Sequence, residues 1–463
     1  MSNLEIKVLD LETDQIGGRT SIIESALVSN DPSKNNQNIS IKSRLNRTNL
    51  MDCRAFAVQN ASLNDLNSPD RISSYKHALF LDRLFNLPDE YILAAHNAKF
   101  EIDSMNQNSF TNLLQPYVLS KRKPLDTLDI FRTASVLDSI NFDFFNPETG
   151  KYSVSMGLLT RLLLEKEEVH RAYDDAVDTI NTLKIVFKKL PEIETLINHV
   201  YDDTNRDKLL ESPLLMRPSF SPTNGPSSQL ITKLDNYDWN NWDLILTIPE
   251  EFTWEGEIND LANKLKEKAK PSVIKTKGVV IFFPNYSNTF KKHYPNYPDE
   301  KIAQIINVIR QDGSYINLKK QEMRTKYSKP KKPDFDDIFH VSDGFFSPHD
   351  RYNAQLFHNG DPEQKYQLCD EFEDKRLIMN AKIIMLHNYR NVMTNKDIQD
   401  VLDYELSELE KPEASRVTFE TFMKSYDEVC SDPKWSKEVI DNLNEYKAHV
   451  LALKANPKLF LEV

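Results

Sequence analysis

The chain has 463 residues, of which 40% are hydrophobic, and a formal net charge of −12 at pH 7. Because this length exceeds what one hydrophobic core usually serves, we expect two or three domains. The acidic balance argues against a general polyanion-binding protein, so any nucleic-acid contact must come from local basic surface or from metal ions in an acidic site. The sequence shows no cleavable signal, no apolar run long enough to span a membrane and no cysteine spacing typical of zinc or disulfides. It therefore predicts a cytoplasmic protein with free thiols and no membrane contact.

The first predicted element is a strand at residues 4–13 (LEIKVLDLET), where polar and apolar residues alternate. Side chains alternate between the faces of a strand, so Asp10 and Glu12 project from the same face. Two adjacent carboxylates repel each other, and a divalent cation is their natural counter-charge. The same pair could instead mark a solvated strand end that enters a turn. Taken alone, this D-x-E pattern is weak evidence for a metal site.

The second segment, residues 91–105 (YILAAHNAKFEIDSM), predicts a buried strand followed by a helix that carries two acids, Glu101 and Asp103. Residues two apart on a helix lie about 200° apart around its axis, so only one of these acids can point into a given site. Glu101 directly follows an aromatic residue. Asp103 is the competing candidate.

The third segment, residues 169–190 (VHRAYDDAVDTINTLKIVFKKL), predicts an amphipathic helix with His170 five residues before Asp175. An Asp at the start of a helix commonly caps it, so we assign capping to Asp174 and chemistry to Asp175, although these roles could be exchanged. His170 by itself could equally be a surface histidine.

The sequence changes character after about residue 200. Residues 212–229 are rich in Pro, Ser, Gly and Asn, which predicts a linker or long loop at a domain boundary. A small β-rich part is then indicated by strands at 242–248 and 279–283 with a helix at 258–269 between them. A second break at 329–334 precedes a region of helical periodicity, with helices expected at 373–389, 396–409 and 436–454.

A basic segment stands out in this acidic chain. Residues 319–332 (KKQEMRTKYSKPKK) contain seven basic side chains and one acid. Single-stranded nucleic acid is usually gripped by basic grooves and aromatic side chains, which makes Lys329, Lys331 and Lys332 candidate substrate contacts. A solvated charged loop is the alternative interpretation.

The order of the acidic segments is more specific than any one of them: D-x-E, then H-N-x-x-F-acid about 90 residues later, then H-x-x-x-x-D at a helix start. This order resembles the histidine-bearing branch of the DEDD exonuclease superfamily. The stretch PLDTLDIFRTA at residues 124–134 also resembles that family, and Asp126 and Arg132 are expected to be structural there. DGFFSPHDR at 343–351 and FEDKRLIMNAKIIMLHNYRN at 372–391 are similar to helical-domain segments of bacterial exonuclease I.

The resemblance implies an α/β protein with an RNase H-like DEDD exonuclease domain at residues 1–200, an SH3-like β-rich domain at 201–335 and an all-helical domain at 336–463. It further implies a monomeric 3′→5′ exonuclease that digests single-stranded DNA to 5′-mononucleotides. Single-strand binding protein is a candidate second partner.

The resemblance also implies a two-metal mechanism with Mg²⁺, for which Mn²⁺ can substitute. Asp10 would bridge the ions, Glu12 and Asp175 would hold the ion beside the attacking water, and the acid of the second segment would support the other. His170 would be the general base. Further candidate substrate contacts are Asn97, Phe100 and Arg376, the last of which could equally be structural.

The second segment departs from the family pattern, because the family usually has Asp where this chain has Glu101. The longer side chain could displace the second metal. Two alternatives therefore stay open: a catalytically impaired module that binds single-stranded DNA, and a 3′→5′ exoribonuclease, since the sequence does not reveal whether a 2′-hydroxyl is tolerated.

Overall fold

The structure is a computed structural model that describes residues 5–15, 20–45, 48–87, 91–201, 203–237, 242–275, 282–285, 287–295, 297–326, 346–411 and 416–461. The chain forms two compact units, each assembled from separate stretches of sequence. The larger unit comprises residues 5–122, 169–177 and 335–463, and the smaller unit comprises residues 1–4, 123–168 and 178–334. No described helix is both long enough and apolar enough to cross a membrane.

In the larger unit, four strands of a mixed sheet run in the order β3 (Ile39–Lys42), β2 (Ile22–Ser29), β1 (Ile6–Thr13) and β4 (Ile92–Ala95). β1 pairs antiparallel with β2 and parallel with β4. The alternation predicted for the first strand is confirmed, because Leu9 and Leu11 enter a buried core while the intervening Asp10 and Glu12 are only half-buried. The acids therefore lie on the face opposite that core.

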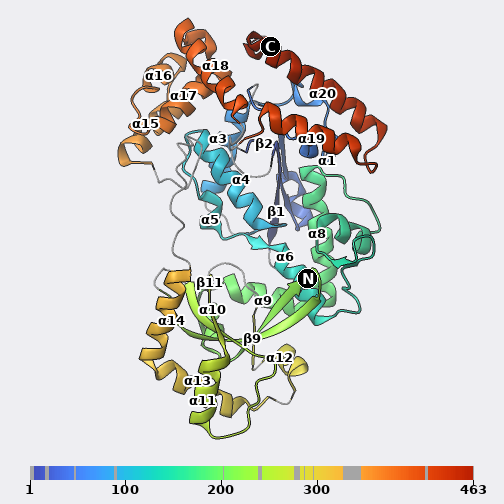
Figure 1. The fold of residues 1–463 in the computed structure, drawn as a ribbon, viewed down its shortest axis with the longest axis vertical. Helices are drawn as coiled ribbons and strands as arrows, with labels where there is room; N and C mark the ends of the chain where they lie inside the picture. The colour runs from blue at the N-terminus through green and yellow to red at the C-terminus, as the bar shows by residue number, and fades with distance from the viewer. Residues whose placement is uncertain are drawn as a thin grey trace. The chain divides into compact units, whose positions relative to one another are not determined.

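Helices α3 (Ser74–Asn86), α4 (Ala98–Thr111) and α5 (Val118–Arg122) form this core with the sheet, and α3 and α4 lie side by side in Figure 1. Their buried residues, including Leu81, Phe85 and Met105, pack against Leu9 and Leu11. Ser73 begins α3 as an N-cap by accepting a hydrogen bond from a backbone amide of the first turn.

A second core joins the early and late parts of the larger unit. α19 (Phe419–Ser431) and α20 (Lys437–Ala455) pack on α1 (Cys53–Val58). The rings of Phe56 and Tyr446 stack with centroids 4.8 Å apart. Residues nearly 400 positions apart in the sequence therefore share one hydrophobic core. The remaining helical elements among the described residues of this unit are η1 (Pro32–Gln37), α2 (Leu63–Leu66), α15 (Pro348–Asn359), α16 (Pro362–Leu368), α17 (Lys375–Asn388), η4 (Arg390–Val392), α18 (Asn395–Glu410) and η5 (Pro457–Leu461).

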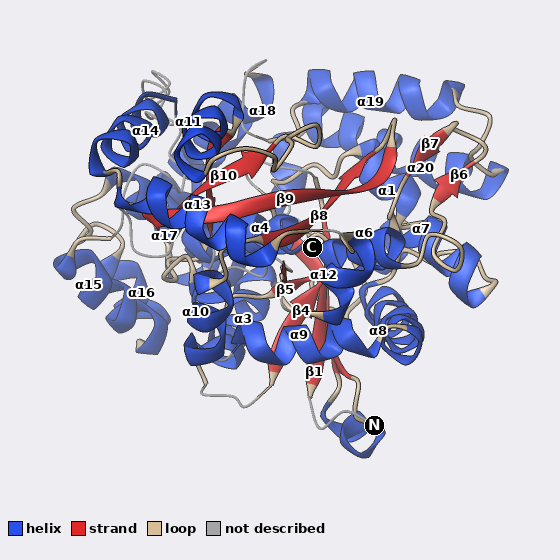
Figure 2. Cartoon of the chain, turned by 90° about the horizontal axis from the view of Figure 1, so that it is seen from below, coloured by secondary structure: helices blue, strands red, loops and turns tan. Residues whose placement is uncertain are grey.

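The smaller unit contains an antiparallel sheet in the order β11 (Lys270–Lys275), β10 (Trp242–Ile248), β9 (Gly225–Asn236), β8 (Leu215–Ser221) and β12 (Phe283–Pro284). Figure 2 shows β9 as a long central strand of this sheet. The other elements are β5 (Leu125–Asp126), α6 (Thr127–Leu137), β6 (Phe145–Asn146), β7 (Lys151–Tyr152), α7 (Met156–Leu159), the π-helix η2 (Thr160–Leu164), α9 (Pro191–Tyr201), α10 (Asp203–Glu211), α11 (Ile258–Lys268), α12 (Asn288–His293), α13 (Asp299–Gln311) and α14 (Gly313–Lys326). Helix α8 (Ala172–Lys189) starts in the larger unit and continues into the smaller one.

The predicted linker at 212–229 is wrong, because most of this segment forms the hairpin of β8 and β9. Among the described residues, β8 pairs with β12 at Leu215 and Met216 and with β9 along its whole length. Gly225 closes the hairpin with a φ of 76°, and the ring of Tyr152 lies 2.8 Å from where a Cβ would be. The segment's turn-forming residues belong to this sheet.

Other predicted elements agree with the structure. The strand at 242–248 and the helix at 258–269 correspond to β10 and α11, and the three late helices correspond to α17, α18 and α20. Most of the predicted strand at 279–283 and the whole break at 329–334 lie outside the described residues. Asp126 caps α6 by accepting a hydrogen bond from the Leu128 amide at 3.0 Å, and the three cysteines are free thiols. The division into three domains at these boundaries stays a prediction.

Candidate metal centre

Three carboxylates predicted to act together lie together in the larger unit. Asp10 and Glu12 come from β1, and Asp175 comes from the first turn of α8. Each contributes one carboxylate oxygen to a group in which all the oxygens lie within 4.8 Å of one another. Asp175 is only 6% exposed, so the negative charges are poorly screened by water and their repulsion favours a bound cation.

The donor set fits a divalent cation. Carboxylate oxygens are hard ligands that suit Mg²⁺, Mn²⁺ or Ca²⁺, and no sulfur donor belongs to the group. These oxygens are close enough to share an ion, or to share two ions if one carboxylate bridges them. The sequence predicted these three residues as metal ligands. Only the fold shows that Asp10 and Glu12 of β1 lie beside Asp175 at the start of α8.

The start of α8 separates the two neighbouring aspartates. The helix begins at Ala172, so Asp174 lies inside the first turn and is not the N-cap that we expected. Asp174 is exposed, whereas Asp175 is buried. An exposed acid in the first turn still interacts favourably with the helix dipole, which gives Asp174 a helix-stabilising role without capping.

His170 lies two residues before this helix. One of its ring nitrogens lies within 4.8 Å of a carboxylate oxygen of Asp175. Burial lowers the pKa of His170, because the charged imidazolium loses hydration there. A neutral imidazole can accept a proton, which is what a general base must do. The backbone of His170 is left-handed, with a φ of 54°.

The two acids of the second segment have different surroundings. Glu101 lies in the first turn of α4 and is 3% exposed. The side chain of Asp103 is 59% exposed and forms an ion pair with Lys99 one turn earlier. Among the described residues, Glu101 does not join the set of oxygens that lie within 4.8 Å of one another. Glu101 therefore faces the interior of the unit, whereas Asp103 pairs with Lys99 at the surface.

The residues predicted to contact substrate differ in their surroundings. Asn97 is exposed at the N-cap of α4 with a left-handed backbone, and Phe100 is half-buried. The Arg376 guanidinium binds Asp374 at 2.6 Å and lies over the ring of Phe110 at 4.9 Å. Lys329, Lys331 and Lys332 lie outside the described residues. The surroundings of Arg376 are those of a structural residue, so its contact with substrate stays a prediction.

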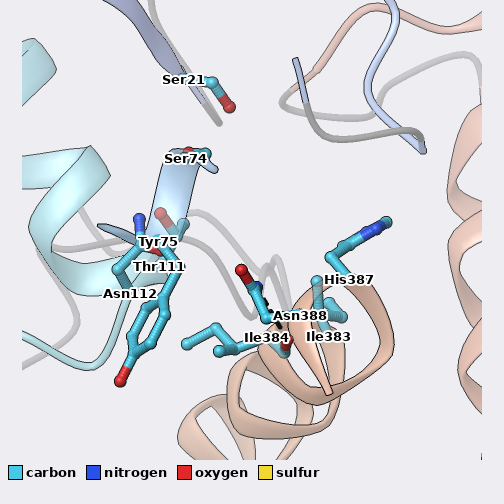
Figure 3. A pocket seen from close by; sticks show the side chains of 9 residues that line it. All are labelled: Ser21, Ser74, Tyr75, Thr111, Asn112, Ile383, Ile384, His387 and Asn388. Atoms are coloured by element: carbon cyan, nitrogen blue, oxygen red, sulfur yellow. Dashed lines mark hydrogen bonds between the residues drawn. The ribbon is translucent and has the colours of Figure 1, made fainter. Parts of the chain in front are cut away.

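A cavity elsewhere in the larger unit has no part in this chemistry. Figure 3 shows it lined by Ser21, Ser74, Asn112, His387 and other residues, none of which is a predicted catalytic residue. Its volume of about 20 Å³ suffices for a water molecule and is far too small for a nucleotide.

The fold has close counterparts among solved structures. Escherichia coli exonuclease I in complex with a dA16 oligonucleotide matches with a TM-score of 0.74 and 15% identity, covering 97% of this chain and 100% of that one. Exonuclease I of Methylocaldum szegediense matches with a TM-score of 0.73, 15% identity and the same coverage. A structure of SSB/exonuclease I with the inhibitor CFAM matches with a TM-score of 0.71 and 16% identity, covering 97% and 100%.

The chain has the exonuclease I fold. In addition, the family model of the exonuclease I C-terminal domain matches residues 334–450. This match spans α15 to α19 and most of α20, and it includes the segments at 343–351 and 372–391 that resemble exonuclease I. The exonuclease I resemblance and the predicted order of α/β, β-rich and helical parts are confirmed. No curated protein sequence matches the chain.

One feature near the site was not predicted from the sequence. Arg171, next to His170, forms an ion pair with Glu24 of β2, and Glu24 also binds Arg71. The partners are more than 45 residues apart in sequence, and no local spacing marks them.

Proposed function

We propose that this chain is a Mg²⁺-dependent 3′→5′ exonuclease that removes 5′-mononucleotides from single-stranded DNA. The observation that carries the proposal is the group formed by Asp10, Glu12 and Asp175 with His170 beside it, within an exonuclease I fold. Phosphodiester hydrolysis requires positioned charge and a base for water, and this group supplies both.

Each residue has a separate role in the proposal. Asp10 and Glu12 hold cations from β1, Asp175 holds them from α8, and Glu101 contributes from α4. When bound, two Mg²⁺ ions neutralise charge at phosphorus and lower the pKa of the attacking water. His170 takes the water's proton at a ring nitrogen, because burial keeps this side chain neutral near pH 7. Mn²⁺ can replace Mg²⁺, since all four acids offer oxygen.

Single-stranded DNA is the proposed substrate. Solved relatives with this fold hold dA16 and dT13 oligonucleotides, which supports a single-strand path in this chain. A solved SSB/exonuclease I complex likewise supports single-strand binding protein as a partner. We further propose that the chain acts as a monomer in the cytoplasm.

A direct assay tests the function. Purified protein with Mg²⁺ is given single-stranded DNA, duplex DNA and RNA of the same sequence, each labelled at the 5′ end in one sample and at the 3′ end in another, with a 3′-phosphorothioate DNA as a control for direction. The proposal expects a ladder that shortens from the 3′ end, mononucleotide products and protection by the 3′-phosphorothioate. Binding of DNA without digestion would identify a catalytically impaired binding module, and faster loss of RNA would identify an exoribonuclease.

A further inference from the structure

The backbone at His170 requires support. Its φ of 54° lies in the left-handed region, which is sterically disfavoured for a residue with a Cβ atom. Such a conformation persists only where the surrounding structure holds it. The direction of the imidazole depends on this backbone angle, so whatever holds the angle also aims the ring.

Arg171 is bonded to His170 and is anchored at both its side chain and its main chain. Its Nε lies 3.1 Å from Oε2 of Glu24, and its Nη2 lies 2.6 Å from Oε1. This bidentate pairing fixes the direction of the guanidinium as well as its position. The carbonyl of Arg171 accepts a hydrogen bond from the Asp175 amide at 3.0 Å. Arg171 therefore connects the candidate base to the turn that carries a candidate metal ligand.

Glu24, which binds Arg171, is held in place by the pairing of β2 with β1. It lies on β2 directly opposite Glu12 of β1, and directly opposite residues of an antiparallel pair project from the same face. Its side chain is 8% exposed. Arg71 binds the same carboxylate at 3.2 Å and donates two further hydrogen bonds, to the carbonyls of Ile23 and Ser43.

The acids of this network are neutralised by nearby cations. Arg71 also binds Asp65 at 2.6 Å, and Arg171 lies 3.7 Å from the same carboxylate. Two arginines thus face two acids, with the more exposed Lys42 at the edge, 3.7 Å from Glu24. Because Glu24 is neutralised, it can lie opposite Glu12 without adding repulsion to the metal centre.

We propose that Arg171 is a positioning residue, which through Glu24 holds His170 in its left-handed conformation and aims the imidazole at the reacting water. This inference rests on the proposed nuclease function. It assigns Arg171 and Glu24 no contact with DNA or metal.

The test compares Arg171→Gln, Glu24→Gln, the double variant and Arg171→Lys with the wild-type chain on single-stranded DNA. We expect each Gln variant to lower kcat about 10- to 100-fold with KM nearly unchanged, since small displacements of a reacting group cost rates of this order. The double variant should be no slower than the slower single variant, because both remove one interaction. Arg171→Lys should be intermediate, since an ammonium keeps the charge but loses the bidentate geometry.

A matched control separates positioning from stability. Arg416 and Glu405 form another buried ion pair of the larger unit, with Nη1 and Oε2 3.1 Å apart. Arg416→Gln should lower Tm and leave kcat unchanged. Hydrogen–deuterium exchange gives a readout that needs no activity: residues 169–172 should exchange faster in Arg171→Gln and Glu24→Gln, and at the wild-type rate in Arg416→Gln.

The outcomes are distinguishable. If the wild-type protein has no nuclease activity, the proposed function is wrong. Hydrogen–deuterium exchange at residues 169–172 still tests whether the Arg171–Glu24 pair holds this segment. An active wild type with unchanged kcat and unchanged exchange in both Gln variants overturns the positioning proposal. A raised KM at unchanged kcat also overturns it, because Arg171 would then contact DNA. If the Gln variants do not fold, Arg171→Lys and Glu24→Asp replace them, and wild-type kcat in both rejects the anchor.

Discussion

Glu101 and Asp103 lie two residues apart on α4 and point into different surroundings, Glu101 into the interior at 3% exposure and Asp103 into solvent beside Lys99. About 200° around the helix axis separates such positions, which explains the difference. We expect Glu101→Gln to inactivate the nuclease and Glu101→Asp to retain or raise its activity. Asp103→Asn should have a much smaller effect, because it removes only a surface ion pair.

Rates on single-stranded DNA at saturating Mg²⁺ test this assignment. Asp103→Asn is the matched control, since it makes the same acid-to-amide change one half-turn away. Inactivation by Asp103→Asn together with a harmless Glu101→Gln would show that the register of the second segment is wrong.

The acid group predicts a dependence of stability on metal. Mg²⁺ or Mn²⁺ should raise the Tm of the wild-type chain, because a ligand that binds only the folded state stabilises it by RT ln(1 + [L]/Kd). Asp10→Asn should abolish this increase and nearly all nuclease activity, while single-strand binding survives. Thermal scans with and without metal measure the effect. An undiminished digestion rate in Asp10→Asn would refute the two-metal assignment.

His170 supplies a kinetic prediction. His170→Ala should lower kcat by roughly 10² to 10⁴-fold, the usual contribution of a general base, with a smaller change in KM. Steady-state rates on an oligonucleotide separate the two constants. If His170→Ala raises KM and leaves kcat unchanged, His170 contacts the substrate and is not the general base.

The stability of the larger unit should depend on pH through His77, which is buried between Ser25 at 2.6 Å and Ser43 at 3.1 Å. Desolvation lowers the pKa of His77 from 6.5 to about 4. As the pH falls from 6.5 towards 4, the unfolded chain therefore binds a proton that the folded chain does not, and the free energy of unfolding decreases. At pH 5 this loss amounts to about 2 kcal/mol.

Denaturant titrations at pH 7.5 and pH 5 check this, with His77→Gln as the comparison. The variant should lose about 2 kcal/mol less than the wild type over that interval, because glutamine does not titrate. Equal losses in both proteins would show that His77 is hydrated in the folded state.

The basic segment yields a prediction from sequence alone. Replacing Lys329, Lys331 and Lys332 with Gln should weaken single-strand binding and flatten the plot of log K against log salt by about 2, given a slope near 0.7 per phosphate contact. Fluorescence anisotropy over a salt series measures the slope. An unchanged slope would support the interpretation as a solvated loop.

Secondary-structure elements that depend on local sequence could be predicted without the structure. Alternation of apolar residues predicted β1 and put Asp10 and Glu12 on one face, and helical periodicity predicted α8, α17, α18 and α20. The prediction failed at 212–229. Turn-forming residues suggested a linker there, whereas β8 and β9 pair as a hairpin. Strand pairing depends on a partner that local composition does not reveal.

Contacts between distant residues became known only from the tertiary structure. It placed Asp175 beside Asp10 and Glu12, which lie some 160 residues earlier, and joined Phe56 to Tyr446 in one core. It also revealed the pairing of Arg171 with Glu24, because ion pairs between remote elements depend on strand register and helix packing. Periodicity fixes the direction of a side chain within its element, whereas burial of the apolar faces fixes which elements come together.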